Sequence, residues 1–263
     1  MTENVDQPSV LGIHLKNRLG QFFRREETPE QVLKKIKKDP KFLPTMAQVR
    51  LAFNLGDEEN IRGYWNVFVR SIHGSHEILT KEYIGALAGY LKNRTRLLGK
   101  KKENLGVILE VGAGEGNLAY HINNALNGNP GDYVLPTDPK KGWLEEETVF
   151  PVEKLDVDAA LLKYSPSIVI VSWMPEGVDW TSKFRSTPSV EEYILIGNMD
   201  HSGKANDTWG DHRGEGFERV PLGDLAQYQL PRFLGVLSDD FKKVDARGAK
   251  KFESTTVSFR RNK

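Results

Sequence analysis

A short glycine-rich segment with a carboxylate at its front is the part of this sequence best suited to bind a ligand. It reads Glu110-Val-Gly112-Ala113-Gly114-Glu-Gly116. Glycine is needed where the backbone must come closer to a ligand than a side chain allows. Surface turns also collect glycine, so the neighbouring residues matter. An apolar run at residues 107–111 precedes the segment and an amphipathic helical pattern follows it, which is the strand, turn and helix setting of a ligand-binding glycine loop.

The spacing of the glycines separates two classes of cofactor. A dinucleotide site has the spacing GxGxxG and places a pyrophosphate at the start of the helix. This segment has GxGxG, and Glu110 stands two residues before the first glycine. A carboxylate there repels a pyrophosphate but attracts a cationic sulfonium ligand with an amino-acid tail. The residues therefore favour a sulfonium cofactor over a nicotinamide dinucleotide.

Alternating strand and helix patterns must position this segment from about residue 105 onward. Short apolar or strand-like runs occur at residues 107–111, 133–135, 152–155, 168–172, 193–196, 241–244 and 255–259. Strands separated by helices form right-handed crossovers, so we expect an α/β fold with a mostly parallel sheet and helices on both faces. Ligands bind such sheets beyond the carboxyl ends of the strands.

The first hundred residues show helical spacing of their apolar residues instead. One helix is predicted over residues 61–72, and a second begins at Thr80, whose hydroxyl can cap the first free amides. A lysine-rich stretch at residues 99–104 is the predicted joint. We therefore expect an α-helical N-terminal extension at residues 1–104 and a cofactor-binding domain at residues 105–263.

The composition excludes several other chemistries. The chain has no cysteine, which rules out disulfides and thiolate sites, and it has no metal-binding motif such as HExxH, so no metal is expected. A net charge of +1 gives no overall attraction to nucleic acid or to an anionic membrane. The basic cluster at residues 92–102 is better interpreted as a solvated helix end than as an RNA contact. A polar N-terminus and the lack of a long apolar run indicate a cytoplasmic protein, with the nucleus as the alternative.

Residues 107–118 resemble motif I of the class I S-adenosylmethionine-dependent methyltransferases. The resemblance implies a seven-stranded, Rossmann-like sheet that ends in an antiparallel hairpin, for which segments 241–244 and 255–259 are the candidates. It also implies S-adenosyl-L-methionine as cofactor, with its methionine portion bound at the turn. On this sequence the cofactor-binding positions are then Glu110, Gly112, Ala113, Gly114 and Gly116.

Two further acids match positions of the same family. Asp138, after the second predicted strand, matches the acid that binds both ribose hydroxyls, and a carboxylate can accept both hydrogen bonds. The alternative is a plain Asp-Pro turn. Asp156, after the third predicted strand, matches the acid that contacts the adenine, and capping of a helix is an equally good interpretation.

After the fourth predicted strand the chain departs from the family pattern. Many amine-methylating members carry a motif of the Asn-Pro-Pro-Tyr type, whereas this chain has Ser172-Trp173-Met174-Pro175. The departure disfavours methylation of a DNA amine or a protein glutamine and leaves small-molecule acceptors open. Ser172 and Trp173 are candidate cofactor contacts, and a simple core role for Trp173 is the alternative. This stretch, with residues 179–181 and 193–197, also resembles uncharacterised methyltransferase-like proteins of fungi and other eukaryotes.

Candidates for the acceptor side lie in two segments. Residues 198–212 mix glycine, aromatic and ionisable residues, which predicts a long active-site lid. Within it His201 is the candidate catalytic base, and a solvated surface histidine is the alternative. His73 and His76 are candidate pocket residues in the link between the two N-terminal helices, where ordinary linker chemistry is the alternative.

Several functions remain open at this point. The first is an S-adenosylmethionine-dependent methyltransferase acting on a small-molecule substrate, with neither nucleic acid nor a membrane as partner. The second is a protein of the same fold that binds the cofactor without methyl transfer, because a fold does not guarantee its usual chemistry. An RNA methyltransferase is a further alternative, and the glycine spacing disfavours an NAD-dependent oxidoreductase.

Overall fold

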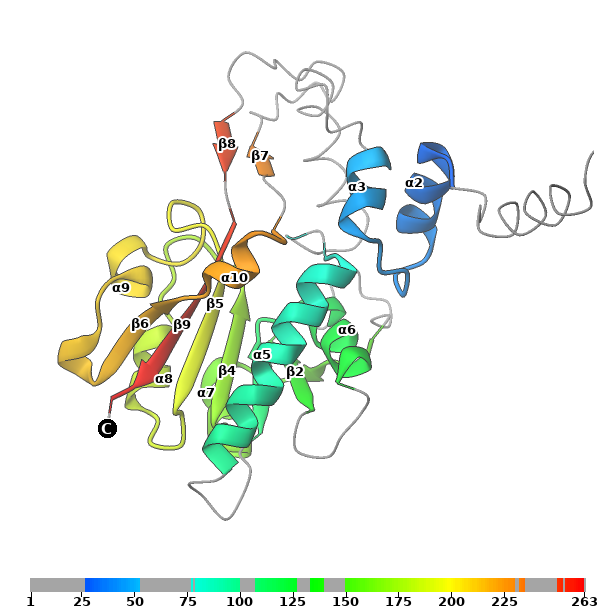
Figure 1. Cartoon of the computed structure of the whole chain (residues 1–263). Coiled ribbons are helices and arrows are strands. Elements are labelled where there is room, and N and C mark those ends of the chain that lie inside the picture. Colours follow the sequence, from blue (N-terminus) through cyan, green and yellow to red (C-terminus); the bar gives the residue numbers. More distant parts are fainter. Residues whose placement is uncertain are drawn as a thin grey trace, which may run out of the picture.

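One mixed sheet with helices on both faces forms the body of the protein (Figure 1). The computed structural model describes residues 27–52, 77, 79–99, 107–126, 133–139, 150–229, 232–234, 250–252 and 254–262. Seven strands are joined in the order β3-β2-β1-β4-β5-β9-β6. Their bounds are β1 Ile108–Val111, β2 Val134–Asp138, β3 Glu153–Lys154, β4 Ile168–Ser172, β5 Glu192–Gly197, β6 Phe217–Pro221 and β9 Thr255–Arg261.

The direction of the strands divides the sheet into two parts. Strands β1 to β5 pair in parallel, whereas β9 runs antiparallel between β5 and β6. The carboxyl ends of the five parallel strands therefore share one edge, the upper one in Figure 1. This arrangement confirms the predicted fold class of a mostly parallel seven-stranded sheet with antiparallel strands at the C-terminal side.

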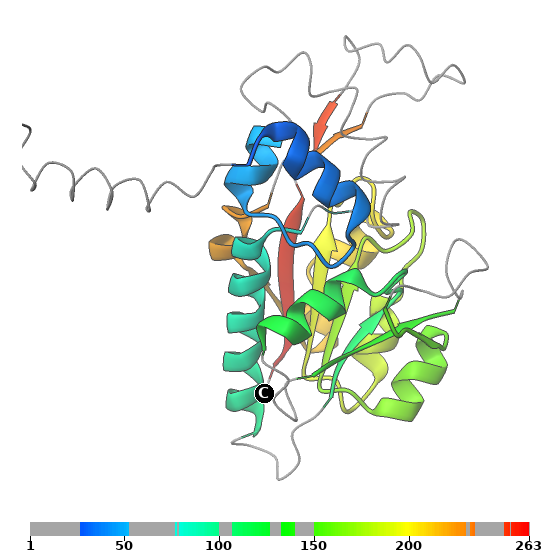
Figure 2. The same cartoon turned by 90° about the vertical axis from the view of Figure 1, so that its right-hand side faces the viewer.

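The helices form a layer on each face of the sheet, as Figure 2 shows with the sheet seen nearly edge-on. On one face lie α5 Lys81–Gly99, α6 Asn117–Ala125 and α10 Gly223–Ala226, and on the other lie α7 Val157–Tyr164, α8 Thr181–Ser186 and α9 Ala205–Trp209. Successive residues of a strand point to opposite faces. Ile168 and Ile170 accordingly belong to the core under α5, whereas Val169 and Val171 belong to the core under α7. The apolar runs of the central strands are buried on both faces for this reason.

Most strands lie where the sequence predicts them. Strand β4 has the predicted bounds, and β1, β5 and β9 differ from them by one or two residues. The second strand begins at Val134 and continues to Asp138, so its carboxyl end includes the predicted ribose-binding acid. The predicted strand at 241–244 lies outside the described residues.

One of the two antiparallel partners of β9 is the strand β6, which the sequence did not predict. Phe217–Pro221 pairs with β9 at the edge of the sheet. It follows the predicted lid at residues 198–212, which is not structureless, because it contains α9 and the buried Trp209 side chain. The 3-10 turn Arg213–Glu215 lies between this segment and β6. The role of the segment as an active-site lid stays a prediction.

The N-terminal residues include one helix that is integral to the sheet and two that lie above it. Thr80 caps α5 as predicted, accepting a hydrogen bond from the Tyr83 amide, and the apolar face of α5 packs on β1, β4 and β5. The helices α2 Pro29–Lys38 and α3 Met46–Ala52 lie near the carboxyl edge in Figure 1, and the Met46 amide donates to Glu82 of α5. The short pair β7 Arg232–Leu234 and β8 Lys250–Phe252 also lies above that edge. The predicted boundary at 104/105 and the helix over 61–72 fall outside the described residues.

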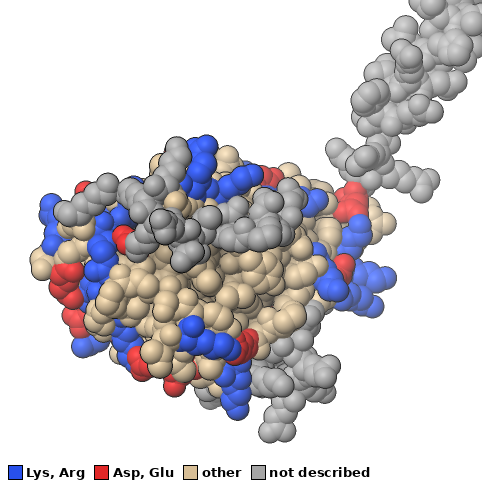
Figure 3. Space-filling view, turned by 90° about the horizontal axis from the view of Figure 1, so that it is seen from below, with Lys and Arg blue, Asp and Glu red and all other residues tan. Residues whose placement is uncertain are grey.

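The opposite edge of the sheet carries charges of both signs. Figure 3 shows this face from below, with Lys and Arg spread around its rim and Asp and Glu among them. Of the predicted basic cluster, Lys92 and Arg96 are exposed, whereas Arg94 binds the buried Glu192. Arg94 therefore forms a structural ion pair rather than a part of an exposed basic surface.

Candidate functional site

The glycine turn joins β1 to α6 at the carboxyl edge. Gly112, Gly114 and Gly116 all have positive φ, at 67°, 56° and 79°, which is the region that glycine enters without steric cost. The Ala113 amide donates to the Thr137 carbonyl, and the Thr137 hydroxyl donates to the Glu110 carbonyl. The ends of β1 and β2 are thereby tied together, so Asp138 lies beside the turn.

Glu110 is a buried acid with an unusual environment. Its side chain is only 2% exposed, and one carboxylate oxygen accepts a hydrogen bond from the Ala119 amide in α6 at 3.1 Å. Among the described residues no cation pairs with it. Burial raises the pKa of Glu110 to about 8, and the charge of Asp138 adds to the rise. A cation bound nearby would favour the charged carboxylate again.

Asp138 closes the turn from the neighbouring strand. Its Oδ2 accepts a hydrogen bond from the Gly114 amide at 3.0 Å. The carboxylate is half-buried rather than enclosed. The turn therefore has one acid beneath it and a second at its rim.

Two of the three glycines are also required by packing within the protein. A Cβ atom built on Gly112 would lie 2.8 Å from the ring of Trp180, and one built on Gly116 would lie 2.7 Å from Val152. The Trp180 indole thus packs against Gly112 and limits the space available to a ligand beside the turn. No local pattern in the sequence points to this contact, since Trp180 comes from the loop between β4 and α8.

The other predicted cofactor contacts lie along the same edge. Asp156 is exposed and is the N-cap of α7, because its Oδ1 accepts from the Ala159 amide at 2.8 Å. Ser172 is the last residue of β4, and Trp173 follows it. The capping role of Asp156 is therefore present in the structure, and its predicted contact with an adenine stays a prediction.

Trp173 is held by residues from two distant segments. Its indole Nε1 donates to Oε2 of Glu77 at 2.8 Å, and the Ser254 hydroxyl donates to the same oxygen at 2.6 Å. Glu77 precedes α5 and Ser254 precedes β9. Sequence reasoning missed Glu77, because a single glutamate outside any motif gives no signal of a contact 96 residues away.

The segment after β5 is bound to the loop after β4. The Gly177 amide donates to the Gly203 carbonyl, and the Gly203 amide donates to the Met174 carbonyl. Asp179 accepts hydrogen bonds from the hydroxyls of Thr181 and Thr208. His201 lies in this segment, in a turn that its amide closes on the Asn198 carbonyl at 3.1 Å, and it is half-buried. Its role as a base stays a prediction, and His73 and His76 lie outside the described residues.

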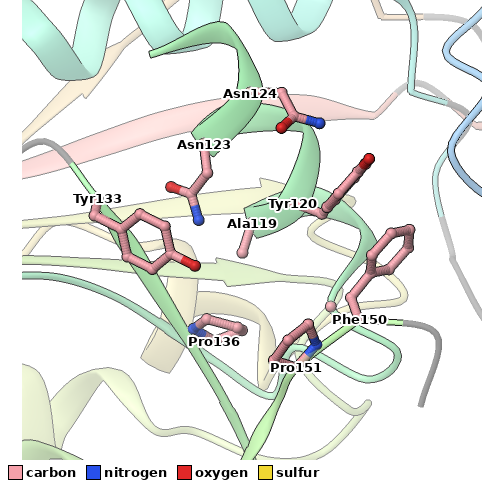
Figure 4. A pocket seen from close by; sticks show the side chains of 9 residues that line it. Ala119, Tyr120, Asn123, Asn124, Tyr133, Pro136, Phe150 and Pro151 are labelled. Carbon is pink, nitrogen blue, oxygen red and sulfur yellow. The ribbon is translucent and has the colours of Figure 1, made fainter. Parts of the chain in front are cut away.

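A cavity of about 340 Å³ lies between α6, β2 and the residues that precede β3 (Figure 4). Tyr120 and Phe150 stack at one side with their ring centres 4.1 Å apart, and Tyr133 lies at the other. Gly116 and Ala119 also line it, whereas Glu110 and Asp138 do not. We assign the candidate site to the acids at the carboxyl edge, because this cavity is lined only by uncharged residues.

The comparisons with known proteins concern the fold. Neither a scan against protein-family models nor a search of curated proteins finds a match. Solved structures that are similar include a protein of Thermoplasma acidophilum described as a methyltransferase, with 17% identity, a TM-score of 0.34, and coverage of 60% of this chain and 68% of that one. A SAM-dependent methyltransferase of Agrobacterium tumefaciens has 11% identity, a TM-score of 0.34 and coverage of 68% and 62%. Magnesium protoporphyrin IX methyltransferase of Synechocystis with bound SAM has 14% identity, a TM-score of 0.32 and coverage of 78% and 98%.

The mostly parallel seven-stranded sheet with antiparallel β9 and β6 agrees with the fold that the resemblance to class I methyltransferases implies. Similarities this weak carry no argument about activity or substrate, and a shared fold hosts many functions. The site itself must supply that argument.

Within the described residues no group of three or more His, Asp or Glu side chains is arranged to hold a metal ion. No helix in the same part of the chain is long and apolar enough to cross a membrane.

Proposed function

We propose that this protein is an S-adenosylmethionine-dependent methyltransferase that acts on a small molecule. The observation that carries the proposal is the buried Glu110, which lies under a glycine turn and has no cation as partner among the described residues. A buried carboxylate is costly unless it is neutralised or paired. A positively charged ligand at the turn would supply the missing partner.

The two acids at the turn have different proposed roles in binding. Glu110 supplies a negative charge beneath the ligand once the cation is bound, and the Ala119 amide holds its Oε2 in place. Asp138 lies at the rim and is only half-buried, so it can accept hydrogen bonds from a ribose diol. Both contacts fit a ligand that combines a cation with an adenosyl group, and neither fits a pyrophosphate.

When bound, S-adenosylmethionine supplies an electrophilic methyl group on a positively charged sulfur. The protein then has to orient an acceptor, exclude water and, for a hydroxyl acceptor, remove a proton. Ser172 ends β4, the strand next to β1, and Trp173 follows it, so both belong to the proposed site. His201 is the proposed base.

Calorimetry with the full chain tests the cofactor. We expect S-adenosylmethionine and S-adenosylhomocysteine to bind and NAD to give no heat of binding. Binding of NAD alone would overturn the proposal. Glu110→Leu should abolish binding, whereas Glu153→Gln, which removes an acid at the edge strand β3, should leave it unchanged.

Methyl transfer requires a second experiment. The protein is incubated with methyl-labelled cofactor and separate extracts of small molecules, RNA and protein. Label in the small-molecule fraction supports the proposal, and label in RNA or protein instead would correct the substrate class. Cofactor binding without label in any fraction would favour a protein that binds the cofactor without methyl transfer.

A further inference from the structure

Three segments that are far apart in the sequence meet at the carboxyl end of β4. Glu77 comes from the segment before α5, Trp173 directly follows β4, and Ser254 directly precedes β9. Both donors, the Trp173 indole and the Ser254 hydroxyl, bind the same carboxylate oxygen of Glu77. Glu77 is 5% exposed and Ser254 is 7% exposed. The contact is therefore an enclosed junction rather than a surface ion pair.

The backbone of Trp173 is strained at this junction. Its φ is +56°, a region that bulky residues rarely enter. Such a conformation is unfavourable and persists only where the surroundings hold it. Here the Trp173 amide donates to the Ile196 carbonyl at 2.8 Å, and Glu77 holds the other end of the residue through its indole.

The order of the strands shows on which side of the glycine turn Trp173 lies. Strand β1, which ends in the glycine turn, lies between β2 with Asp138 and β4 with Trp173. A ligand whose ribose lies at Asp138 and whose cation lies near Glu110 extends from β2 toward β1. The next strand in that direction is β4, so its end faces the reactive part of the ligand.

We propose that Glu77 is a positioning residue that holds the Trp173 indole as the wall of the acceptor side, against which a flat acceptor packs. Aromatic faces bind flat partners in stacked or offset arrangements. The inference rests on the proposed function and adds to it a residue from outside the core sheet. Since Glu77 lies before α5 and Ser254 directly precedes β9, the segments before α5 and β9 both help to position this wall.

The test uses the full chain labelled with 5-fluorotryptophan and needs no knowledge of the acceptor. The fluorine resonance of Trp173 is assigned by its loss in Trp173→Phe. S-adenosylmethionine and S-adenosylhomocysteine differ by one methyl group and the charge on sulfur. We expect the two ligands to shift the Trp173 resonance by different amounts, because the indole faces the methyl group. Trp209, which is buried in the core under α8, should give the same shift with both.

Two matched substitutions test the role of Glu77. Glu77→Gln keeps an oxygen that can accept from both donors, so the difference between the ligands should remain. Glu77→Leu removes the acceptor, and the difference should disappear, while the affinity for both ligands stays within about threefold of the original. Urea unfolding of each variant checks that it is folded.

Failure of this inference is distinct from failure of the proposed function. If calorimetry detects neither ligand, the proposed function fails and the inference fails with it. If both ligands bind but shift Trp173 equally, the indole does not face the methyl group. If the difference survives in Glu77→Leu, Glu77 does not position the indole.

Discussion

Two of the glutamates that are buried in the described part of the chain, Glu192 and Glu110, have opposite surroundings. Glu192, fully buried at the amino end of β5, accepts hydrogen bonds from Tyr90, Arg94 and Ser258, and Arg260 lies 3.9 Å away. Glu110, near the carboxyl end of β1, accepts one hydrogen bond from a backbone amide, and no cation of the described residues pairs with it.

The difference separates a structural acid from a binding acid. Glu192 links α5, β5 and β9, and two arginines balance its charge, so it contributes to the fold. Glu110 is held in a place where its charge is unfavourable, and such groups cluster at functional sites. Buried acids of the same type can thus be distinguished by whether the fold itself supplies the counter-charge.

The largest effect is expected where the counter-charges are already present. Glu192→Gln keeps the shape of the side chain but leaves Arg94 and Arg260 without a negative partner. We expect the free energy of unfolding to fall by about 3 kcal/mol at pH 7, since breaking a buried ion pair is strongly destabilising. Urea unfolding measures this. An unchanged midpoint would show that the arginines are satisfied by solvent instead.

The same substitution at Glu110 is expected to have the opposite sign. The pKa of Glu110 is about 8 in the folded protein, above its ordinary value of 4.5. The unfolded chain therefore releases this proton first, and stability falls as the pH rises from about 4.5 to about 8. Glu110→Gln removes this loss, so it should stabilise the protein by roughly 3 kcal/mol more at pH 8 than at pH 5. Urea unfolding at both values checks it, and destabilisation at pH 8 would contradict the comparison.

A smaller effect, on binding alone, is expected at Asp138. Asp138→Asn keeps an oxygen for the Gly114 amide, so stability should change by less than about 0.5 kcal/mol. It removes the charge and one of the acceptors for the ribose, so cofactor affinity should fall by about tenfold, or about 1.4 kcal/mol. Calorimetry measures the affinity. Asp158→Asn, at an exposed acid of α7, is the control and should leave it unchanged.

The smallest effect is expected at Asp156, where a structural role is visible. Asp156→Ala should cost about 1 kcal/mol of stability, and Asp156→Ser almost nothing, because serine also caps helices. If Asp156 contacts the adenine as well, Asp156→Ser weakens cofactor binding while stability stays the same. Equal stability of Asp156→Ala and the original chain would contradict the capping role.

The central strands were predictable because burial on both faces leaves a continuous apolar run. Strand β4, with the sequence Ile-Val-Ile-Val-Ser, is the clearest case. Strand β6 was missed for the opposite reason. Its sequence Phe-Glu-Arg-Val-Pro is largely polar and ends in proline, which is typical of an edge strand.

The candidate site was predictable only where its residues are neighbours in the sequence. Glu110 and the glycines form one local motif, and Asp138 ends the next strand, so topology brings them together. Glu77 and Trp180 reach the same edge through contacts over long sequence separations. Such contacts depend on how whole segments pack, and a single sequence carries no local record of them.

The central claim is that a positively charged ligand provides the counter-charge for the buried Glu110 carboxylate. The release of a proton from Glu110 on binding tests this claim most directly. At pH 7 a group with a pKa of about 8 is mostly protonated, and a bound cation should drive the proton off. Calorimetry of S-adenosylmethionine binding in two buffers of different ionisation enthalpy counts the protons released. We predict release of most of one proton by the original chain and none by Glu110→Gln. Binding without proton release in the original chain would contradict the account.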